Sequence, residues 1–412
     1  MSATFPDLAR RPGLPAPTTA RARLSAAVLD GLGLSLEVYD DLASALPLWG
    51  EIDAPAVASA FQSPAWLTAW TRSAPADDTE RPLIVAGRSS SGRLLFILPL
   101  ALTTTMGTTV LRFLGQPHAN YNLGLYDAQF IAGVRPWEMR AALAALSRLR
   151  PFSAVHFAEQ PRRWNGFDNP LASISPQRAA NESYQLALAP DFDAWYDTQF
   201  SSRTRATMRR KARRLEEAGP VTFARVTDAT ERLQSIEAFL AAKSPQLREQ
   251  GLGDPFSDPR VGAFYRALVT PDSGAGLDVV ALRAGNRVVA IELVLNGDGR
   301  AYLLNSVVTD ESFAECSPGA LLLKHDIETA SRQGHVAFDF GPGKGAHKSA
   351  WKPGTVELCA SVFAMSPAGL PAVALLSAAN LAKRTIKSSP VLWSATRSLR
   401  RRLRGRLPDQ AG

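Results

Sequence analysis

The amino-acid sequence predicts an α/β protein of two domains, each a mixed sheet flanked by helices. Three observations lead to this fold class. The chain of 412 residues is long enough for two or three domains. Hydrophobic residues make up 46% and charged residues 20% of it, which is the composition of a globular protein. One order of strands and helices also appears twice along the chain.

The two halves share this order: strand, helices, antiparallel meander, helix, strand. Apolar runs and alternation predict the strands, and apolar residues at helical spacing predict the helices. In the first half we expect strands at 34–39, 82–88, 94–103, 110–114, 154–158 and 184–188, and helices at 41–48, 64–73 and 136–149. In the second half we expect strands at 221–226, 278–283, 287–295, 301–308, 336–340 and 356–364, and helices at 231–242, 259–269 and 318–332. The repetition predicts domains at 33–188 and 189–365.

The N-terminal segment differs in composition from these two halves. Residues 1–32 are rich in Pro, Ala and Arg and are expected to form a disordered arm. No run of about 18 apolar residues occurs, so we expect no membrane span. Cys316 and Cys359 are too few for a disulfide framework or a multi-cysteine zinc site, and they fit a reducing cytoplasm. The five histidines show no metal-binding spacing, so no metal is expected.

The net charge of +8 comes from two basic blocks. Seven Lys and Arg lie in 203–214 and nine in 383–406, both without an acidic residue, and the remainder is mildly acidic. In the first block Met208, Ala212 and Leu215 form a narrow docking face on a helix that is otherwise cationic. That helix is either a solvated face or a contact for a membrane, RNA or the nucleotide end of a cofactor. The aromatic residues of an RNA platform are absent, and the charge is no evidence for DNA.

The second basic block, within the tail 366–412, predicts an amphipathic helix. Its apolar face holds Val391, Leu392, Ala395, Leu399 and Leu403, and its basic face holds Arg397, Arg400, Arg401 and Arg404. This is the pattern of a helix that lies on an anionic lipid surface. A helix packed on the body or a disordered basic tail are the alternatives. We therefore expect a cytoplasmic protein with a possible peripheral contact at the inner membrane face.

The segment 301–353 is the most informative part of the sequence. A strand leads into Ser317-Pro318-Gly319-Ala320, where serine suits the N-cap and proline the first helical position. Such a glycine-bearing helix start exposes N–H groups that suit a phosphate, although it can also be only a well-capped helix. A second strand then ends in Asp339-Phe-Gly341-Pro-Gly343, and a loop with Lys348 and Trp351 follows.

These motifs resemble the CelD-like acetyltransferases of bacterial polysaccharide (cellulose) biosynthesis, a family within the GNAT acyl-CoA N-acyltransferase superfamily. The likeness rests on the S-P-G helix start, the F-D-F-G strand end with its lysine loop, and the segments 61–70 and 201–211, and it covers residues 35–365. It implies a tandem GNAT fold, similar to the Fem-type peptidoglycan aminoacyltransferases, which agrees with the duplicated order of elements.

The resemblance also implies the binding sites. Acetyl-CoA or another acyl-CoA would be the co-substrate, held by Ser317, Pro318, Gly319, Ala320 and Leu321. The common GNAT motif R/Q-x-x-G-x-G/A is altered here, since Cys316 stands at its first place and Leu321 at its last, so this role follows from the S-P-G version. His118, Asn120 and Tyr121 would form an acceptor site, unless they are a surface loop. Lys348 and Trp351 are further candidates for the acceptor, with a solvated loop lysine as the alternative for Lys348.

Acyl transfer to an amine requires a base. Glu292 interrupts the apolar strand 288–295, so we expect it to be partly buried with a raised pKa, or to be the structural partner of an arginine. Asp339 at the end of its strand is the second candidate, with a loop-capping role as its alternative. Asn305 would orient the substrate or be a satisfied strand amide. A covalent acyl-enzyme on Cys316 is disfavoured, because no histidine is fixed beside it.

Together these features predict an acyltransferase that acylates an amine or hydroxyl of a sugar or sugar-linked precursor by direct attack, in polysaccharide or cell-envelope biosynthesis. Two alternatives remain. One is Fem-type aminoacyl transfer from aminoacyl-tRNA, for which the basic helix is suited. The other is a non-catalytic scaffold subunit of a polysaccharide-synthesis complex, because the standard phosphate motif is altered.

Overall fold

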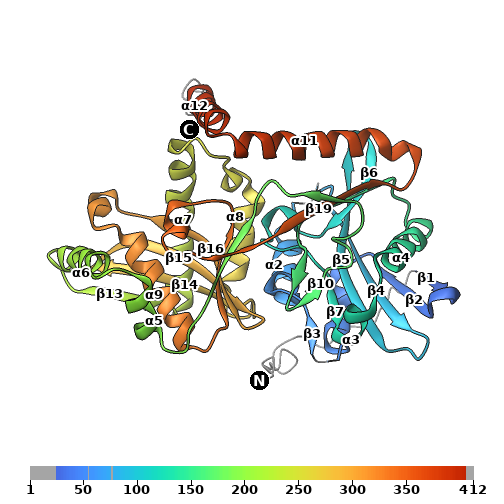
Figure 1. The fold of residues 1–412 in the computed structure, drawn as a ribbon, viewed down its shortest axis with the longest axis horizontal. Coiled ribbons are helices and arrows are strands. Elements are labelled where there is room, and N and C mark those ends of the chain that lie inside the picture. Colours follow the sequence, from blue (N-terminus) through green and yellow to red (C-terminus); the bar gives the residue numbers. More distant parts are fainter. Residues whose placement is uncertain (1–24, 54, 76–77, 405–412) are drawn as a thin grey trace. The chain divides into compact units, whose positions relative to one another are not determined.

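The computed structural model describes residues 25–53, 55–75 and 78–404 (Figure 1). The chain divides into two compact units. The N-terminal unit comprises the described residues up to Glu182 together with Val356–Arg384, and the C-terminal unit comprises Ser183–Thr355 and the described residues from Thr385 onward. Each unit holds a sheet with helices packed on it, which confirms the predicted α/β class.

The N-terminal unit contains a ten-stranded sheet with the order β1-β2-β4-β5-β6-β8-β19-β11, to which β3 and β7 are attached. Neighbouring strands are antiparallel except β6 and β8, which are parallel. The strands of this unit are β1 (Ser25–Leu29), β2 (Leu34–Tyr39), β3 (Ala56–Val57), β4 (Arg81–Ser89), β5 (Leu94–Thr105), β6 (Thr108–Phe113), β7 (Leu125–Asp127), β8 (Ala154–Pro161), β9 (Arg163–Trp164), β10 (Phe167–Asp168), β11 (Pro176–Arg178) and β19 (Leu358–Ala364). Its helices are α1 (Leu42–Ala45), α2 (Pro64–Arg72), α3 (Ala128–Gly133), α4 (Pro136–Leu149) and most of α11 (Leu370–Ser388).

The C-terminal unit contains a seven-stranded sheet with the order β13-β14-β15-β16-β17-β12-β18. Its strands are β12 (Ser183–Ala187), β13 (Val221–Arg225), β14 (Leu277–Ala284), β15 (Arg287–Gly297), β16 (Arg300–Val308), β17 (Ala337–Pro342) and β18 (Gly354–Val356). Its helices are α5 (Phe192–Gln199), α6 (Ser202–Glu216), α7 (Ala229–Glu249), α8 (Pro259–Leu268), α9 (Pro318–Arg332), α10 (Ala346–Ser349) and α12 (Pro390–Arg404). The predicted helices at 136–149 and 318–332 are confirmed at both ends as α4 and α9.

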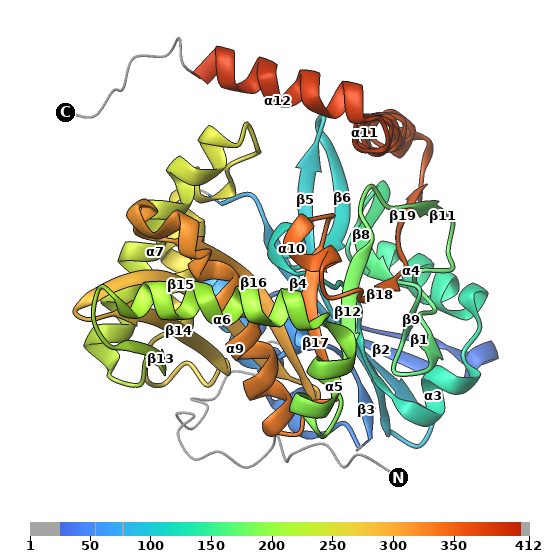
Figure 2. The same ribbon diagram turned by 60° about the vertical axis from the view of Figure 1, so that its left-hand side comes forward.

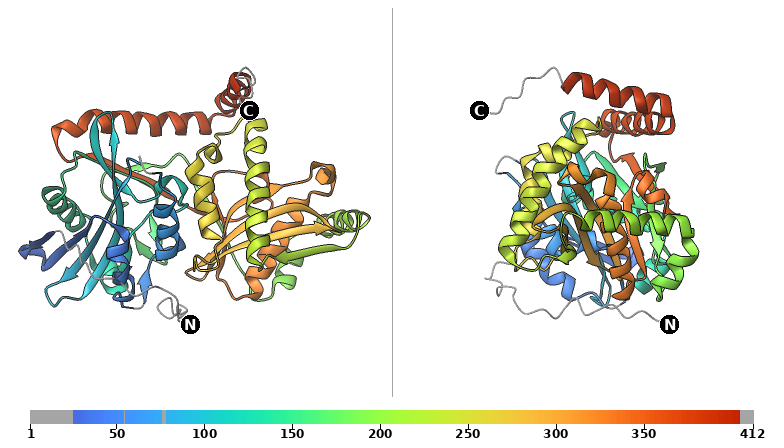
Figure 3. Two further views of the ribbon diagram at one scale, coloured as in Figure 1. Left: turned by 180° about the vertical axis from the view of Figure 1, so that it is seen from behind. Right: turned by 90° about the vertical axis from the view of Figure 1, so that its left-hand side faces the viewer.

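Two layers of helices cover the sheet of the C-terminal unit. Helix α9 packs on β14, β15 and β16, with α5 and α6 on the same side (Figure 2). The apolar core of that side includes Leu322 and Ile327 of α9 together with Ala290 and Val294 of β15. Helices α7 and α8 cover the other face, as the reverse view in Figure 3 shows.

Strands β16 and β17 part from each other within this sheet. They run parallel, but their register covers only three pairs, from Arg300 with Ala337 to Tyr302 with Asp339. Both strands continue beyond that point, since β16 reaches Val308 and β17 reaches Pro342. Strand β16 also carries one extra residue opposite the Leu293/Val294 step of β15, which is a β-bulge. A wedge therefore opens between the two strands next to the bulge.

Two strand assignments differ from the sequence-based domain boundaries. The strand expected to close the first half is β12, which pairs with β17 in the C-terminal unit. The strand expected to end the second half is β19, which pairs with β8 and β11 in the N-terminal unit. Periodicity reports that a segment is a strand, whereas its partner strand is chosen by tertiary packing. The boundaries at 188/189 and 365/366 therefore have to be corrected, because each unit is made of two chain segments.

The structure also differs in part from the predictions for the two terminal segments, 1–32 and 366–412. Residues Ser25–Leu29, placed in the disordered arm, form β1 and pair with β2. The rest of that arm, 1–24, lies outside the described residues. The tail is helical over α11 and α12, and α11 packs Ala372 against Val110 and Ala154 of the N-terminal unit. Among the described residues, no helix is both long enough and apolar enough to cross a bilayer.

Candidate functional site

The start of α9 lies at the end of β16, after the short 3-10 helix η6 (Glu311–Cys316). Pro318 occupies the first helical position, as predicted, but Ser317 does not cap the helix with its side chain. Its backbone is left-handed, with φ 50° and ψ 56°, and its Oγ accepts a hydrogen bond of 2.6 Å from Lys211 Nζ instead. The hydroxyl of Ser317 is therefore linked to the basic helix rather than to the backbone of α9.

Gly319 brings the first turn of α9 against β16. A Cβ at this position would lie 3.9 Å from both Ser306 Oγ and Val308 Cγ2, which is ordinary van der Waals contact. The carbonyl of Ser317 accepts from the N–H groups of Ala320 (3.0 Å) and Leu321 (3.3 Å). Leu321 is buried in the core, so among the five predicted cofactor-binding residues it is a packing residue. Pro318 is buried too, whereas Ser317, Gly319 and Ala320 are half-buried. The positive end of the helix dipole favours an anion at this turn.

Helix α6 lies beside this turn (Figure 2). Its predicted docking face is confirmed, because Leu215 is buried and Met208 and Ala212 pack against the core. Lys211 contacts Ser317, and Arg214 forms an ion pair of 2.7 Å with Glu315 of η6. Four further arginines of the helix are exposed to solvent: Arg203, Arg209, Arg210 and Arg213. The start of α9 is thus bordered by positive charge.

Glu292 on β15 is buried, with 1% of its surface exposed, and faces α9. Its carboxyl group shares a hydrogen bond with Asp326 of α9 and receives one from the hydroxyl of Ser306 on β16. Neither Glu292 Oε2 nor Asp326 Oδ2 receives a hydrogen bond from a described donor group. Two ionised carboxylates in hydrogen-bonding contact would repel each other, so this pair favours the state in which one of them holds a proton.

Burial accounts for the titration of this pair. It raises the pKa of Glu292 to about 7 and raises the pKa of Asp326 well above its usual value, where the charge of Glu292 adds to the effect. Lys243 of α7 donates a hydrogen bond of 2.7 Å to the Ser306 carbonyl, and burial lowers its pKa to about 8. The partners of Glu292 are thus a second carboxyl, a hydroxyl and a lysine, and not an arginine.

Asp339 and Lys348 form a second cluster at β17. Asp339 is fully buried and its Oδ1 accepts from the N–H of Gly341 at 2.8 Å. Lys348 Nζ donates to the carbonyls of Gly341 (3.0 Å) and Pro342 (3.2 Å), and burial lowers its pKa to about 8 although the nearby Asp339 opposes this shift. Lys348 is therefore not a solvated loop lysine. Asp339 makes a hydrogen bond to the loop backbone, as expected for a loop-capping acid.

The two candidate bases point to opposite faces of the sheet. Glu292 contacts α9, whereas Asp339 lies between Phe338 and Phe340, and both phenylalanines belong to the core on the α9 side. Side chains alternate along a strand, so Asp339 faces the side that α7 and α8 cover. The structure therefore separates two residues that the sequence could only offer as equivalent candidates.

Asp298 is a further buried acid, and no sequence pattern marks it as one. It lies in the turn between β15 and β16, its Oδ1 accepts from the hydroxyl of Tyr302 (2.6 Å) and its Oδ2 from Arg300 (2.8 Å). Burial is the main cause that raises its pKa to about 7, and Asp339 adds to it. The turn sequence Asn296-Gly297-Asp298-Gly299 looks like an ordinary hairpin, so only the structure reveals this carboxyl.

Asn305 and Trp351 have structural partners. Asn305 donates its amide to the hydroxyl of Tyr265 on α8 at 2.8 Å, which matches the alternative of a satisfied amide. Trp351 is buried in an aromatic cluster with Trp195, Tyr196 and Phe200. With only 6% of the residue exposed, Trp351 packs in the core, and its role in substrate binding stays a prediction.

The predicted acceptor residues of the N-terminal unit lie around η4 (Gln116–His118). Tyr121 is completely buried and packs 4.6 Å from Trp164, so it belongs to the core. His118 is half-buried, with its ring 4.9 Å from that of Trp70. Asn120 is half-buried too, and its Nδ2 has no hydrogen-bond partner among the described residues. The Asn120 amide nitrogen is therefore a buried donor to which an acceptor molecule could bind.

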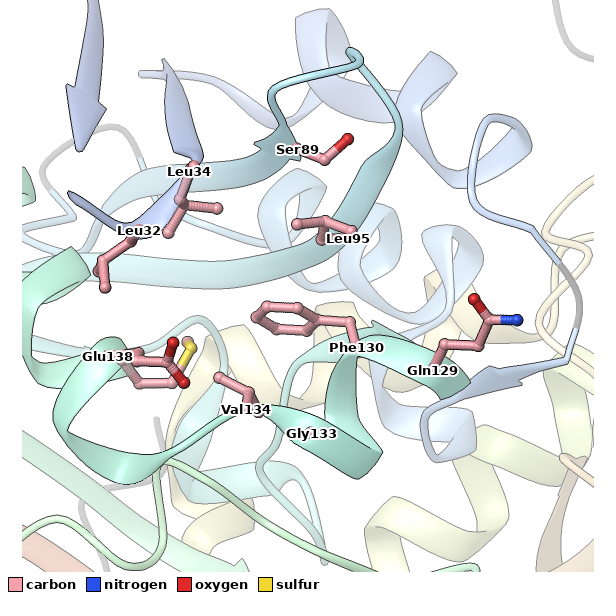
Figure 4. Close-up of a pocket in the computed structure, with 11 residues that line it drawn as sticks. Leu32, Leu34, Ser89, Leu95, Gln129, Phe130, Gly133, Val134 and Glu138 are labelled. Atoms are coloured by element: carbon pink, nitrogen blue, oxygen red, sulfur yellow. The ribbon is translucent and has the colours of Figure 1, made fainter. Parts of the chain in front are cut away.

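Two of the cavities in the described residues are lined by other residues than the predicted acceptor set. One of about 350 Å³ lies in the N-terminal unit, where Phe130 points toward Leu95 and Leu34 (Figure 4). The other, of about 270 Å³, lies in the C-terminal unit between α6 and η6 and is lined by residues such as Arg214, Phe313 and Cys316. The second cavity therefore adjoins the start of α9. No group of three His, Cys, Asp or Glu side chains in the described ranges has the geometry for a metal ion.

Comparisons with known proteins concern the fold and one segment of the chain. Residues 202–349 match the family model "Acetyltransferase (GNAT) domain". No curated protein matches the chain. Among solved structures, FemX is similar, with a TM-score of 0.51 and 10% identity over 74% of this chain and 92% of that chain. The C-terminal domain of a putative lysylphosphatidylglycerol synthetase from Agrobacterium fabrum matches with a TM-score of 0.45 and 12% identity, over 78% of this chain and 91% of that one.

A tandem GNAT protein from the clavulanic acid biosynthesis pathway gives a TM-score of 0.42 at 14% identity, over 78% of this chain and 93% of that chain. At these identities the likeness to FemX concerns the fold alone. The finer resemblance to the CelD-like family stays a prediction. The chain has an α/β fold like that of FemX, and its segment 202–349, which includes α6, the wedge between β16 and β17 and the start of α9, matches the GNAT acetyltransferase domain.

Proposed function

We propose that this protein is an acyl-CoA-dependent acyltransferase that acylates an amine or hydroxyl of a sugar or sugar-linked precursor. The observation that carries the proposal is the position of Ser306. Its hydroxyl donates to the buried Glu292 carboxylate and also lies against Gly319 at the start of α9. A base with a pKa near neutrality is thereby linked to the point where an anionic donor would bind. The sugar acceptor rests on the sequence resemblance, which also suggests polysaccharide biosynthesis.

The donor would bind at the first turn of α9. Its phosphates would meet the positive end of the helix dipole, with Lys211 already hydrogen-bonded to Ser317 at the same turn. The exposed arginines of α6 add positive charge for the phosphorylated nucleotide end. A residue larger than alanine at Gly319 would enter the space next to Ser306 and Val308 and obstruct this site.

Glu292 would be the base, acting through Ser306. As the acceptor nitrogen attacks the thioester carbonyl, its proton passes to the Ser306 hydroxyl and the hydroxyl proton passes to Glu292. The C–S bond then breaks, the thiolate leaves, and the proton on Glu292 returns to it through solvent. A pKa of about 7 keeps a large share of Glu292 ionised at neutral pH, which suits a general base.

Asp339 would hold the loop rather than accept the proton. One of its carboxylate oxygens already accepts from Gly341, and the neighbouring Lys348 is fixed by two carbonyls of the same strand end. Lys348 keeps one donor for an anionic group of the acceptor, since an ammonium group has three. Asp339 and Lys348 would thus hold the loop at the end of β17 beside the wedge, and Glu292 would accept the proton.

Calorimetric titration with acetyl-CoA tests the proposal. The wild-type protein is expected to show saturable binding, Gly319→Ala to retain it, and Gly319→Glu to lose it, because only glutamate adds bulk and negative charge. Product assays over a panel of amino sugars then test turnover. Absence of binding by the wild type would contradict the proposal, and binding without turnover would favour the scaffold subunit.

A second candidate is Fem-type aminoacyl transfer from aminoacyl-tRNA. The specific observation in its favour is the row of exposed arginines on α6, in a chain whose fold is like that of FemX. Under this function aminoacyl-tRNA would bind with an affinity that falls steeply with salt, and acetyl-CoA would not bind. The same titrations distinguish the two donors.

A further inference from the structure

Helix α12 exposes its apolar face. The exposed fraction is 76% for Val391, 43% for Leu392 and 57% for Leu399. These residues and Ala395 lie on one side of the helix, at the spacing expected for a single stripe. An exposed stripe of large aliphatic side chains indicates a surface that interacts with another body.

The opposite side of α12 packs against the end of α7. Arg397 Nε donates a hydrogen bond of 2.6 Å to the carbonyl of Gln250, and the backbone of Arg397 lies against Gly251. Trp393 and Thr396, on the same side as Arg397, are half-buried. The helix is therefore docked to its unit through a polar side, while the apolar stripe is left outward.

The charge of this helix is entirely positive. No acidic residue occurs between Lys383 and Arg404, and Arg400 and Arg401 are exposed. The other basic helix, α6, differs in one respect, since its apolar residues Met208 and Leu215 are packed in the core. α6 therefore offers charge alone, whereas α12 offers charge together with uncovered aliphatic side chains.

We propose that α12 docks this protein on an anionic lipid bilayer. Val391, Leu392 and Leu399 enter the boundary between headgroups and acyl chains, and Arg400 and Arg401 reach lipid phosphates from the flanks of the stripe through their long side chains. RNA would use the arginines but leaves the aliphatic stripe in water, and a soluble acidic protein offers no acyl layer. This surface is independent of the proposed enzymatic function.

The experiment is vesicle flotation of the full chain. Vesicles of phosphatidylcholine alone are compared with vesicles that contain phosphatidylglycerol at 30 mol%. We expect binding to the anionic vesicles and at least tenfold weaker binding to the neutral ones. The variant L392S/L399S removes the stripe and R400Q/R401Q removes charge, and each should bind the anionic vesicles at least tenfold more weakly.

The matched control is Leu233→Ser, a leucine of α7 with 45% exposure that should leave binding unchanged. Circular dichroism confirms that each variant is folded. Equal binding to both vesicle types, or full binding by L392S/L399S, would overturn the proposal. So would binding to RNA without binding to anionic vesicles, which would assign the helix to a nucleic acid.

Discussion

The carboxyl groups of Glu292 on β15 and Asp326 on α9 are joined by a hydrogen bond inside the C-terminal unit. The two residues are far apart in sequence, and each would be costly to bury alone. Together they hold one proton, and Ser306 connects them to the start of α9. This pair places a group that titrates near neutrality beneath the proposed donor site.

Glu292→Gln should abolish most turnover and leave the fold intact. Glutamine has nearly the same size and carries no buried charge, but it cannot accept the proton. A loss of about 10² to 10⁴ in kcat is the usual effect of removing a general base. Product assays with acetyl-CoA measure it, and titration should show unchanged donor binding. Wild-type kcat in this variant would exclude Glu292 as the base.

Asp326 should act as a positioning residue, visible in the pH profile. Its hydrogen bond lowers the pKa of Glu292 against the effect of burial. Asp326→Leu removes this donor, so the acidic limb of the kcat profile should move to higher pH. Asp326→Asn retains an N–H donor and should shift it less. If both variants lower kcat equally at every pH, the residue is only structural.

Thermal stability should fall as the pH rises from 5 to 8. The pKa of Glu292 is raised from 4.5 to about 7, so the folded state keeps a proton that the unfolded state loses. This stabilising contribution is complete below pH 4.5 and disappears as the pH passes 7. Between these two pKa values the contribution of Glu292 alone to the free energy of unfolding should fall by about 1.4 kcal/mol for each pH unit. Melting curves at pH 5 and pH 8 should show a smaller difference for Glu292→Gln than for the wild type.

Lys211→Ala should weaken acetyl-CoA binding about threefold to tenfold, because it removes a cation from the first turn of α9. The effect should shrink at high salt, since exposed charges are screened. Arg248→Ala on α7 removes an exposed cation elsewhere in the same unit and serves as the control. Calorimetry at two salt concentrations provides the measurement. Equal affinities for the wild type and Lys211→Ala would separate α6 from the donor site.

Trp351→Ala should destabilise the protein by about 3 to 5 kcal/mol, which is typical of a large buried aromatic residue. Its ring lies 5.0 Å from that of Phe200 and only 6% of the residue is exposed. Trp137→Ala is the control, because Trp137 on α4 is 60% exposed and should change stability little. Denaturant unfolding measures both. A stable Trp351→Ala variant with a raised KM would restore the substrate-binding role.

Much of the local structure follows from the sequence alone. Apolar periodicity places α4 and α9 correctly, because each helix has proline at its first position and one continuous apolar stripe. The glutamate inside an apolar strand is enough to predict a buried acid at Glu292, and the narrow apolar face of α6 predicts how that helix docks. These features depend on neighbours within a few residues of the chain, so the sequence carries them directly.

The tertiary structure decided the rest. It brought Asp326 and Ser306 to Glu292, and it separated Glu292 from Asp339 on opposite faces of a sheet. It also placed β12 in the C-terminal unit and β19 in the N-terminal unit, the reverse of what the sequence predicts. It also buried Trp351 and left the stripe of α12 uncovered. Strand partners, shared protons and exposed faces depend on contacts between distant segments, and local periodicity does not encode them. The sequence by itself therefore determined which helices and strands form, and the packing of those elements determined which of their side chains can act together.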